Sequence, residues 1–217
     1  SQPDPVDTFD SFDSPLCVPD GYISGRKTLS IQGLAPVRVV DSLELRDVRS
    51  RGMTMGWDTT SVETIGTPCA TATDRTKCQN DVAARMPMDG FSWIYAPLGS
   101  RKYSYLVTTQ GDSVAVIGDM AGVKDFLGPI DTPQEALFWV PVQKDPMWPT
   151  FRISCTGKAA GAIHEVADGY QVVAYTVYYP TYYQSIYYQH LLHVSRLGDV
   201  TVIQTKNLPP AYCVGCY

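Results

Sequence analysis

Pairs of alternating apolar and polar runs, separated by short turn sequences, recur through the second half of the chain. YSYLVTT and SVAVIG flank Gln110-Gly111-Asp112, and AIHEVA and YQVVAYTVYY flank Asp168-Gly169. SIYYQHLLHVSR and DVTVIQT meet at Leu197-Gly198. Alternation with a period of two predicts strands, and a tight turn between two strands predicts a hairpin. We therefore expect an antiparallel meander in this half of the chain.

Two helix starts lie between these hairpins. Asp119 precedes MAGVKDFL and Gly128 follows it, which predicts a helix capped at both ends. In DTPQEALFWV, Thr132 stands at the N-cap, Pro133 at the first helical position, and Glu135 completes a capping box. These signals are structural and say nothing about catalysis.

The first half of the chain carries weaker patterns. TLSIQG (28–33) and VRVVDSLELR (37–46) have the alternation of strands, and KCQNDVAARM (77–86) is typical of a short helix. Taken together, the patterns predict a β-rich α+β protein, with an antiparallel meander sheet and a few short helices.

No linker divides the chain after residue 17, so the simplest organisation is one domain over residues 17–217. Two subdomains that meet near residues 85–92 are the alternative. Residues 1–16 carry four Asp, three Pro and no basic residue. This composition is typical of a tether, whereas Phe9 and Phe12 would let the same segment dock on the domain as an ordered arm.

The cysteines are even in number and scattered along the chain: Cys17, Cys69, Cys78, Cys155, Cys213 and Cys216. This pattern favours an oxidising compartment and a disulfide-stabilised fold. Cys69–Cys78 is the favoured local pair, because it would close the short loop CATATDRTKC. A bond from Cys155 or Cys17 to the terminal CVGC would then fix the tail. The alternative, a zinc site at Cys213 and Cys216, lacks a second Cys-x-x-Cys pair.

Charge and motifs exclude several classes of function. The net charge is −5 and the chain has no cluster of Lys and Arg, which argues against nucleic acid and anionic membrane partners. No apolar run reaches the roughly 18 residues of a membrane span. The chain contains no P-loop, no H-E-x-x-H and no G-x-S-x-G elbow. No cofactor and no metal are therefore expected.

The three histidines, His164, His190 and His193, are the candidates for catalysis. Residues three apart on a strand point to opposite faces, so His190 and His193 cannot bind one ion from a regular strand. The face of His190 is apolar and predicts a core position, whereas His193 lies on the more polar face. The two turns predict three cross-strand pairs: His190 with Thr205, His193 with Val202, and His164 with Val173.

Six tyrosines fall between Tyr178 and Tyr188, in YYPTYYQSIYY. Tyrosine favours strands, and cross-strand aromatic pairs stabilise hairpins, so packing alone can explain part of this segment. Adjacent pairs place rings on both faces, however, and Pro180 indicates a loop or a strand crossing. Tyrosine at a loop is typical of recognition surfaces. The candidate contact residues are Tyr178, Tyr179, Tyr182, Tyr183, Tyr187 and His193.

From about residue 100 to residue 217 the sequence resembles predicted lipoproteins of myxobacteria, whose activity is not assigned. Shared are a Leu-Gly-x-Ile-Asp-Thr-Pro-x-Glu-Ala stretch, a Gly-Tyr-x-Val-Val strand, a Val-Ser-x-x-Gly-x-Val hairpin and a Cys-Val-Gly end. In this chain these are Leu127, Gly128, Ile130, Asp131, Thr132, Pro133, Glu135, Ala136, Gly169, Tyr170, Val172, Val173, Val194, Ser195, Gly198, Val200, Cys213, Val214 and Gly215. The extra Cys216 and the tyrosines depart from that pattern.

The resemblance implies a secreted or lipid-anchored envelope protein, in which Ser1 would follow a lipid-modified cysteine. It supplies no catalytic residue. The leading hypothesis is an exported binding module of the cell envelope or extracellular space. Its partner would be a glycan, a peptide or a protein, the protein itself included. Two alternatives stay open: a secreted, metal-dependent hydrolase centred on His164 and His193, and a self-assembling structural subunit.

Overall fold

In the computed structural model, the chain forms two compact units. Residues 29–138 form the N-terminal unit, and the residues from Trp139 onward belong to the C-terminal unit. The division falls within one helix. The described residues are 29–50, 57–95, 101–144, 147–148, 154–155, 158–159, 163–181, 184–207 and 211–212.

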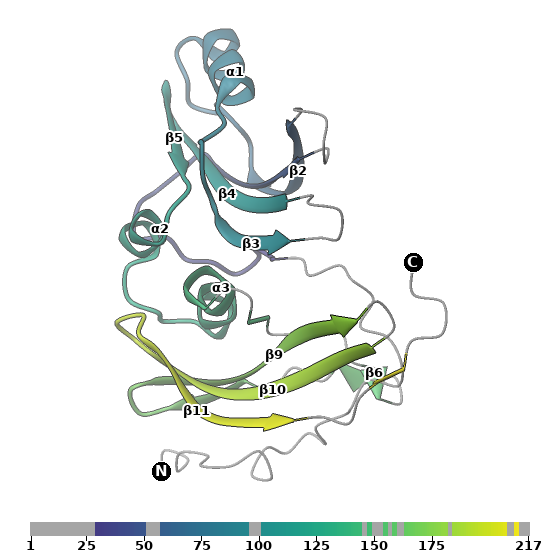
Figure 1. Cartoon of the computed structure of the whole chain (residues 1–217). Coiled ribbons are helices and arrows are strands. Elements are labelled where there is room, and N and C mark those ends of the chain that lie inside the picture. Colours follow the sequence, from purple (N-terminus) through teal and green to yellow (C-terminus); the bar gives the residue numbers. More distant parts are fainter. Residues whose placement is uncertain are drawn as a thin grey trace. The chain divides into compact units, whose positions relative to one another are not determined.

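The N-terminal unit is built on one antiparallel sheet with the strand order β2-β1-β4-β3 (Figure 1). Its strands are β1 (Ser42–Ser50), β2 (Trp57–Gly66), β3 (Phe91–Tyr95), β4 (Arg101–Gln110) and β5 (Ser113–Ile117). β5 also pairs with β4, through Leu106 to Gln110, while β3 pairs with its first residues. Gln110 pairs with Ser113, which confirms the predicted hairpin at Gly111-Asp112.

Helix α1 (Arg75–Ala84) packs on one face of this sheet and confirms the helix predicted over KCQNDVAARM. Its buried Cys78 and Val82 join a core cluster with Val48, Tyr103, Tyr105 and Val107. The predicted disulfide between Cys69 and Cys78 is present, with both residues buried. Closing a loop of this length stabilises a fold by about 3 kcal/mol in the chain-entropy account.

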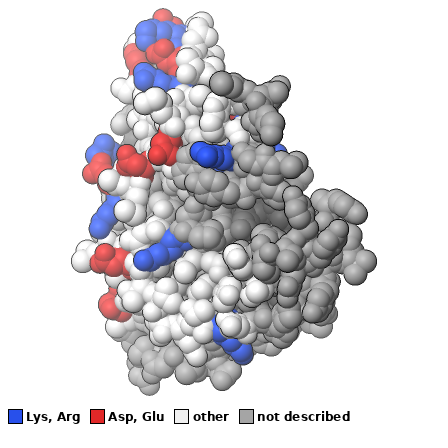
Figure 2. All heavy atoms as spheres, in the orientation of Figure 1, with Lys and Arg blue, Asp and Glu red and all other residues white. Residues whose placement is uncertain are grey.

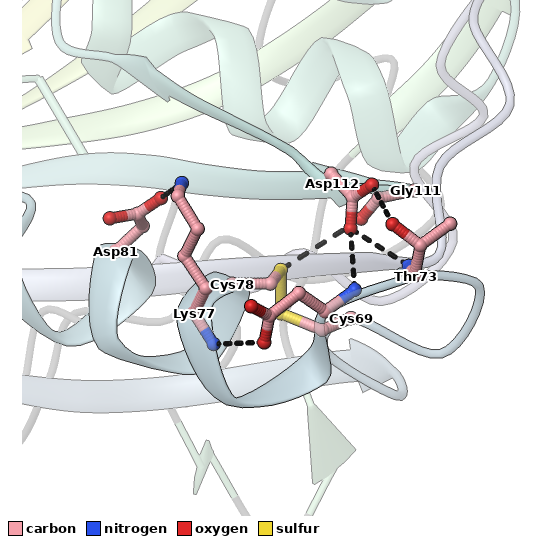
Figure 3. A network of polar contacts seen from close by, with 8 residues as sticks. Cys69, Thr73, Lys77, Cys78, Asp81, Gly111 and Asp112 are labelled. Atoms are coloured by element: carbon pink, nitrogen blue, oxygen red, sulfur yellow. Dashed lines mark hydrogen bonds and ion pairs between the residues drawn. A yellow bond between two sulfur atoms is a disulfide. The ribbon is translucent and has the colours of Figure 1, made fainter.

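The Asp112 carboxylate, on the turn between β4 and β5, holds the loop that the disulfide closes (Figure 3). Asp112 accepts hydrogen bonds from the backbone N–H of Thr73 (2.8 Å), the Thr73 hydroxyl (2.5 Å) and the backbone N–H of Asp74 (3.1 Å). The hydroxyl bond, together with the backbone donors, holds the pKa of Asp112 below its ordinary value. This acidic group is thus used within the fold.

Both predicted helix starts are confirmed. α2 (Met120–Leu127) is capped by Asp119, which accepts from the N–H of Gly122 at 2.7 Å, and it ends at Gly128 with a φ of +73°. In α3 (Pro133–Gln143) the N–H of Glu135 donates to the Thr132 hydroxyl, and the Glu135 carboxylate accepts from the N–H of Thr132.

The strand predicted over residues 28–33 is wrong for its described residues, and the strand predicted from residue 37 begins only at Ser42. Long-range contacts take the backbone donors of this segment instead. Ile31 N–H donates to the Glu63 carboxylate (2.7 Å), Ala35 N–H to the Glu135 carboxylate (3.0 Å), and Val37 N–H to the carbonyl of Phe126 (3.1 Å). The donors are satisfied without a sheet partner, so no strand forms.

A second antiparallel sheet, ordered β11-β10-β9-β8, forms the C-terminal unit (Figure 1). A short strand, β12, pairs with the start of β10, and two further strands, β6 and β7, pair only with each other. The strands are β6 (Ser154–Cys155), β7 (Lys158–Ala159), β8 (Ile163–Val166), β9 (Gly169–Thr181), β10 (Gln184–Ser195), β11 (Val200–Asn207) and β12 (Ala211–Tyr212). The predicted meander is confirmed.

These findings confirm the β-rich α+β class with antiparallel sheets, short helices and a disulfide. The single domain over residues 17–217 stays a prediction, and the tether at 1–16 lies outside the described residues. The side chain of Cys155 and the residues Cys17, Cys213 and Cys216 also lie outside them, so their pairing stays a prediction. In the described part of the chain, no helix combines the length and the apolar character that a membrane crossing requires.

Candidate functional site

The tyrosine segment lies at one end of the long hairpin formed by β9 and β10. The two strands pair from Gly169 and Ser195, beside the turns to β8 and β11, to Thr181 and Gln184 at the distal end, where β9 leads into β10. Residues 176–190, which span this distal end, include no Asp, Glu, Lys or Arg. A ligand of this end would therefore be recognised by ring contacts and hydroxyl groups rather than by ion pairs.

Tyr178 is the more exposed of the two tyrosines of this segment whose side chains are described. Its side chain is 60% exposed, and its backbone pairs with that of Ile186. Tyr188 is half-buried on the same face, where its ring stacks on His190 with 6.4 Å between centroids. The side chains of the other candidate tyrosines, Tyr179, Tyr182, Tyr183 and Tyr187, lie outside the described residues.

The hairpin is firmly held just before this exposed end. Tyr175 is buried, and its hydroxyl accepts a hydrogen bond from the amide of Gln189 at 2.9 Å. Its backbone exchanges two hydrogen bonds with Trp148, of 2.9 and 3.0 Å. Burial raises the pKa of Tyr175 against the opposing effect of the Gln189 hydrogen bond. The tyrosine segment therefore extends from a well-packed, hydrogen-bonded part of the hairpin.

His190 connects three strands next to this end. One ring nitrogen contacts the Thr176 hydroxyl of β9 at 2.9 Å, and the other contacts the Thr205 hydroxyl of β11 at 3.0 Å. The side chain is buried, which confirms the predicted core position, and the predicted pairing with Thr205 is correct. Burial disfavours the charged ring and lowers the pKa of His190 below its ordinary value.

We predict that His190 makes the free energy of unfolding fall as the pH drops through about 6.5, the pKa of histidine in an unfolded chain. The folded-state pKa of His190 is below that of the unfolded chain, so the unfolded state takes up the proton first. The contribution of neutral His190 to the free energy of unfolding is therefore fully present above the unfolded-state pKa. It is lost as the pH falls through that value towards the folded-state pKa. One proton gives a slope of at most about 1.4 kcal/mol per pH unit.

Urea unfolding at a series of pH values measures this slope. The His190→Gln variant, which removes the titrating ring, should flatten it. A His190→Gln variant with the wild-type slope would assign the pH dependence to another group.

His193 lies near the opposite end of β10, where its Nε2 is 3.1 Å from the Asp168 carboxylate. The predicted pairing of His193 with Val202 is wrong. His193 pairs with Thr201, because the turn runs from Ser195 to Asp199 rather than only through Leu197 and Gly198. A bulge at Ile203 then restores the pairing of His190 with Thr205.

The predicted pairing of His164 with Val173 is also wrong. Val166 pairs with Gly169, so the turn is Ala167-Asp168 and His164 pairs with Gln171. Gln171 in turn pairs with His193, so His164 and His193 lie in one row on the same face with β9 between them. Gln171 therefore stands between the two histidines in this row, and His193 is not a direct cross-strand neighbour of His164.

A second ionic pair closes this end of the sheet. The Arg196 guanidinium is 2.8 Å from the Glu165 carboxylate and lies over the Tyr170 ring at 5.5 Å from its centroid. The Glu165 hydrogen bond raises the pKa of Arg196.

Within the described ranges, no group of three His, Cys, Asp or Glu side chains is arranged to hold a metal ion. Figure 2 shows described acidic and basic residues intermixed on the face in view.

The chain was compared with protein-family models, curated proteins and solved structures. None matches. The resemblance to myxobacterial lipoproteins therefore stays a prediction, and no residue role comes from a relative.

Sequence reasoning missed three partners at these positions. Asp168 was assigned to a turn rather than to His193, and neither Thr176 nor the Tyr175–Gln189 pair was singled out. Strand alternation could have found Thr176, since it lies on the face of His190. The place of Asp168 depends on the position of the turn, which lies one residue before the one that the Asp-Gly dipeptide suggests.

Proposed function

We propose that the chain is an exported binding module of the cell envelope or extracellular space, and that the segment Tyr178–Tyr188 is its contact surface. The supporting observation is the contrast between Tyr175, buried and hydrogen-bonded, and Tyr178, three residues further and 60% exposed. The disulfide between Cys69 and Cys78 is compatible with an oxidising location. The resemblance to envelope lipoproteins supports the same location.

The absence of charged residues from positions 176–190 favours an uncharged ligand, and a neutral glycan fits it best. Tyrosine rings give large apolar area for sugar rings, and their hydroxyls hydrogen-bond to sugar hydroxyls. Recognition of this kind depends little on salt, because no ion pair has to form across the interface. A neutral peptide is the alternative ligand.

Retention on immobilised neutral polysaccharides tests this function. Tyr178→Ser should weaken retention by at least about tenfold, the effect of losing a ring contact worth about 1.4 kcal/mol. The Tyr182→Ser/Tyr183→Ser double variant should abolish retention. High salt should leave the wild-type protein bound. Leu197→Ser is the matched control, because Leu197 is an exposed apolar residue on the turn at the opposite end of β10.

Equal retention of Tyr178→Ser, the double variant and the control would show that the tyrosines only pack the hairpin. Retention on an immobilised neutral peptide and not on any polysaccharide would assign the surface to polypeptide ligands.

The hydrolase alternative has one supporting contact, between His193 and Asp168. The β9 strand between His164 and His193 argues against a shared metal, and metal analysis of the wild type against His193→Ala tests it.

A further inference from the structure

Exposed methionines gather in the described part of the N-terminal unit. Met86, Met88 and Met120 are 48%, 101% and 48% exposed. Methionine is among the residues most often buried, and a neutral thioether has little reason to face water. Met86 and Met88 are part of the sequence Met-Pro-Met, directly after helix α1. This pair of thioethers takes no part in the core or in the proposed tyrosine surface.

The sheet holds the Met-Pro-Met segment at two points. The Tyr105 hydroxyl donates to the carbonyl of Arg85 at 3.1 Å, and the Tyr103 hydroxyl donates to the carbonyl of Pro87 at 2.8 Å. Two carbonyls, two residues apart, thus face the same sheet, as they do in an extended segment. In such a segment the side chains of Met86 and Met88 point to one side, so their sulfur atoms can approach a common point.

The position of the Met86 sulfur is set by β2. The Thr59 hydroxyl donates to the Met86 Sδ at 3.4 Å. Trp57 lies two residues before Thr59 and therefore shares its face of the strand. Its ring is 5.9 Å from that of Tyr103 and is 47% exposed. A solvent-exposed indole ring thus lies on the same face of β2 as Thr59, the residue whose hydroxyl contacts the Met86 sulfur.

Residues of opposite charge flank the methionine pair, and Arg85 directly precedes Met86. Asp89 follows Met88 directly. Burial raises the pKa of Tyr103, and the charges of Tyr105 and Asp89 raise it further, which places the Asp89 carboxylate within electrostatic reach of the segment. A cation between the methionines would have one negative and one positive neighbour along the chain, so attraction to it must come from the thioethers and the indole. The face of the indole attracts a cation as well.

We propose that Met86 and Met88, with the Trp57 ring beside them, form a binding site for a soft monovalent metal ion, Cu(I). Thioether sulfur prefers soft ions, and hard Ca²⁺ or Mg²⁺ would require oxygen ligands. In the described part of the chain no cysteine thiol is free, because Cys69 and Cys78 are paired. Thioethers form no disulfides, so they remain available as ligands under the conditions that oxidise the cysteines.

Competition for Cu(I) with bicinchoninate under anaerobic conditions tests the site in the full chain. The wild-type protein should withdraw one ion per chain from the coloured chelate, and Met86→Leu/Met88→Leu should lose that ion. Leucine conserves volume, and both residues are exposed, so the variant should keep the wild-type melting temperature. Met147→Leu, a change in the C-terminal unit, is the matched control and should withdraw copper like the wild type.

Tryptophan fluorescence gives a second readout. Cu(I) should quench the emission of the wild type more than that of Trp57→Phe. Three outcomes would overturn the site: no withdrawal of copper by the wild type, equal withdrawal by Met86→Leu/Met88→Leu, or loss of copper from Met53→Leu/Met55→Leu instead. Polysaccharide retention tests a separate surface, so each proposal can fail without the other.

Discussion

Replacing Glu135 by alanine is expected to lower the free energy of unfolding by about 3–6 kcal/mol. The Glu135 side chain is 1% exposed, and its carboxylate accepts from the backbone N–H groups of Ala35 (3.0 Å), Asp131 (2.9 Å) and Thr132 (3.0 Å). Alanine would leave all three donors without their acceptor, at about 1–3 kcal/mol for each donor that stays buried. A protein of ordinary stability would be close to unfolding.

Urea unfolding followed by circular dichroism measures this loss. Glu135→Gln should lower the free energy of unfolding less than Glu135→Ala does. The glutamine side chain keeps one acceptor oxygen, although its NH₂ group cannot accept a hydrogen bond. Thr132→Ala is the matched control: it removes only the hydroxyl that accepts from the N–H of Glu135, a change of about 1 kcal/mol. A Glu135→Ala variant no less stable than Thr132→Ala would show that the three donors find other partners.

The second large effect is expected at Arg46. Its guanidinium lies buried in the sheet of the N-terminal unit, 2.8 Å from the Glu44 carboxylate and 2.8 Å from the carbonyl of Val82 in α1. Burial opposes the charge of Arg46, but the hydrogen bonds to Glu44 and Tyr105 raise its pKa. Arg46→Met would leave the Glu44 carboxylate buried without its partner, a loss of about 3–5 kcal/mol.

The double variant Glu44→Leu/Arg46→Met tests whether the loss of stability comes from leaving one buried charge without its partner. Removing both charges should restore most of the stability, since apolar residues of similar size replace buried ion pairs at little cost. Arg38→Met is the control at a solvent-exposed pair, with Asp125 at 2.6 Å, and should change the stability little. A double variant as unstable as Arg46→Met would assign the loss to the Val82 contact instead of Glu44.

The elements that could be predicted from the sequence are those whose signals are local. The capping box at Thr132 and Glu135, the cap at Asp119 and the disulfide loop between Cys69 and Cys78 each lie within ten residues, and each is confirmed. The hairpins were found for the same reason. A turn and its two flanking runs are contiguous, so alternation and turn chemistry suffice.

What could not be predicted depends on distant partners. Residues 28–33 and 37–41 alternate like strands, yet Glu63, Phe126 and Glu135 take backbone donors of this segment. The register of the histidines failed for a related reason. One residue of turn length moves His193 from Val202 to Thr201, and a bulge at Ile203 then reverses that shift before His190. The candidate tyrosines could be named from the sequence, but the well-packed, hydrogen-bonded part of the hairpin at Tyr175 could not.

The contact between Ala35 and Glu135 joins residues that are 100 positions apart. During synthesis from the amino end, residues 29–41 emerge before all three acceptors, and long before α3, which supplies the acceptor of Ala35. The N-terminal unit therefore cannot complete its folding step by step along the chain. Its first segment must wait, with its backbone in water, until α3 has emerged. In a chain that ends before residue 126, residues 29–41 would therefore stay accessible to proteases and chaperones.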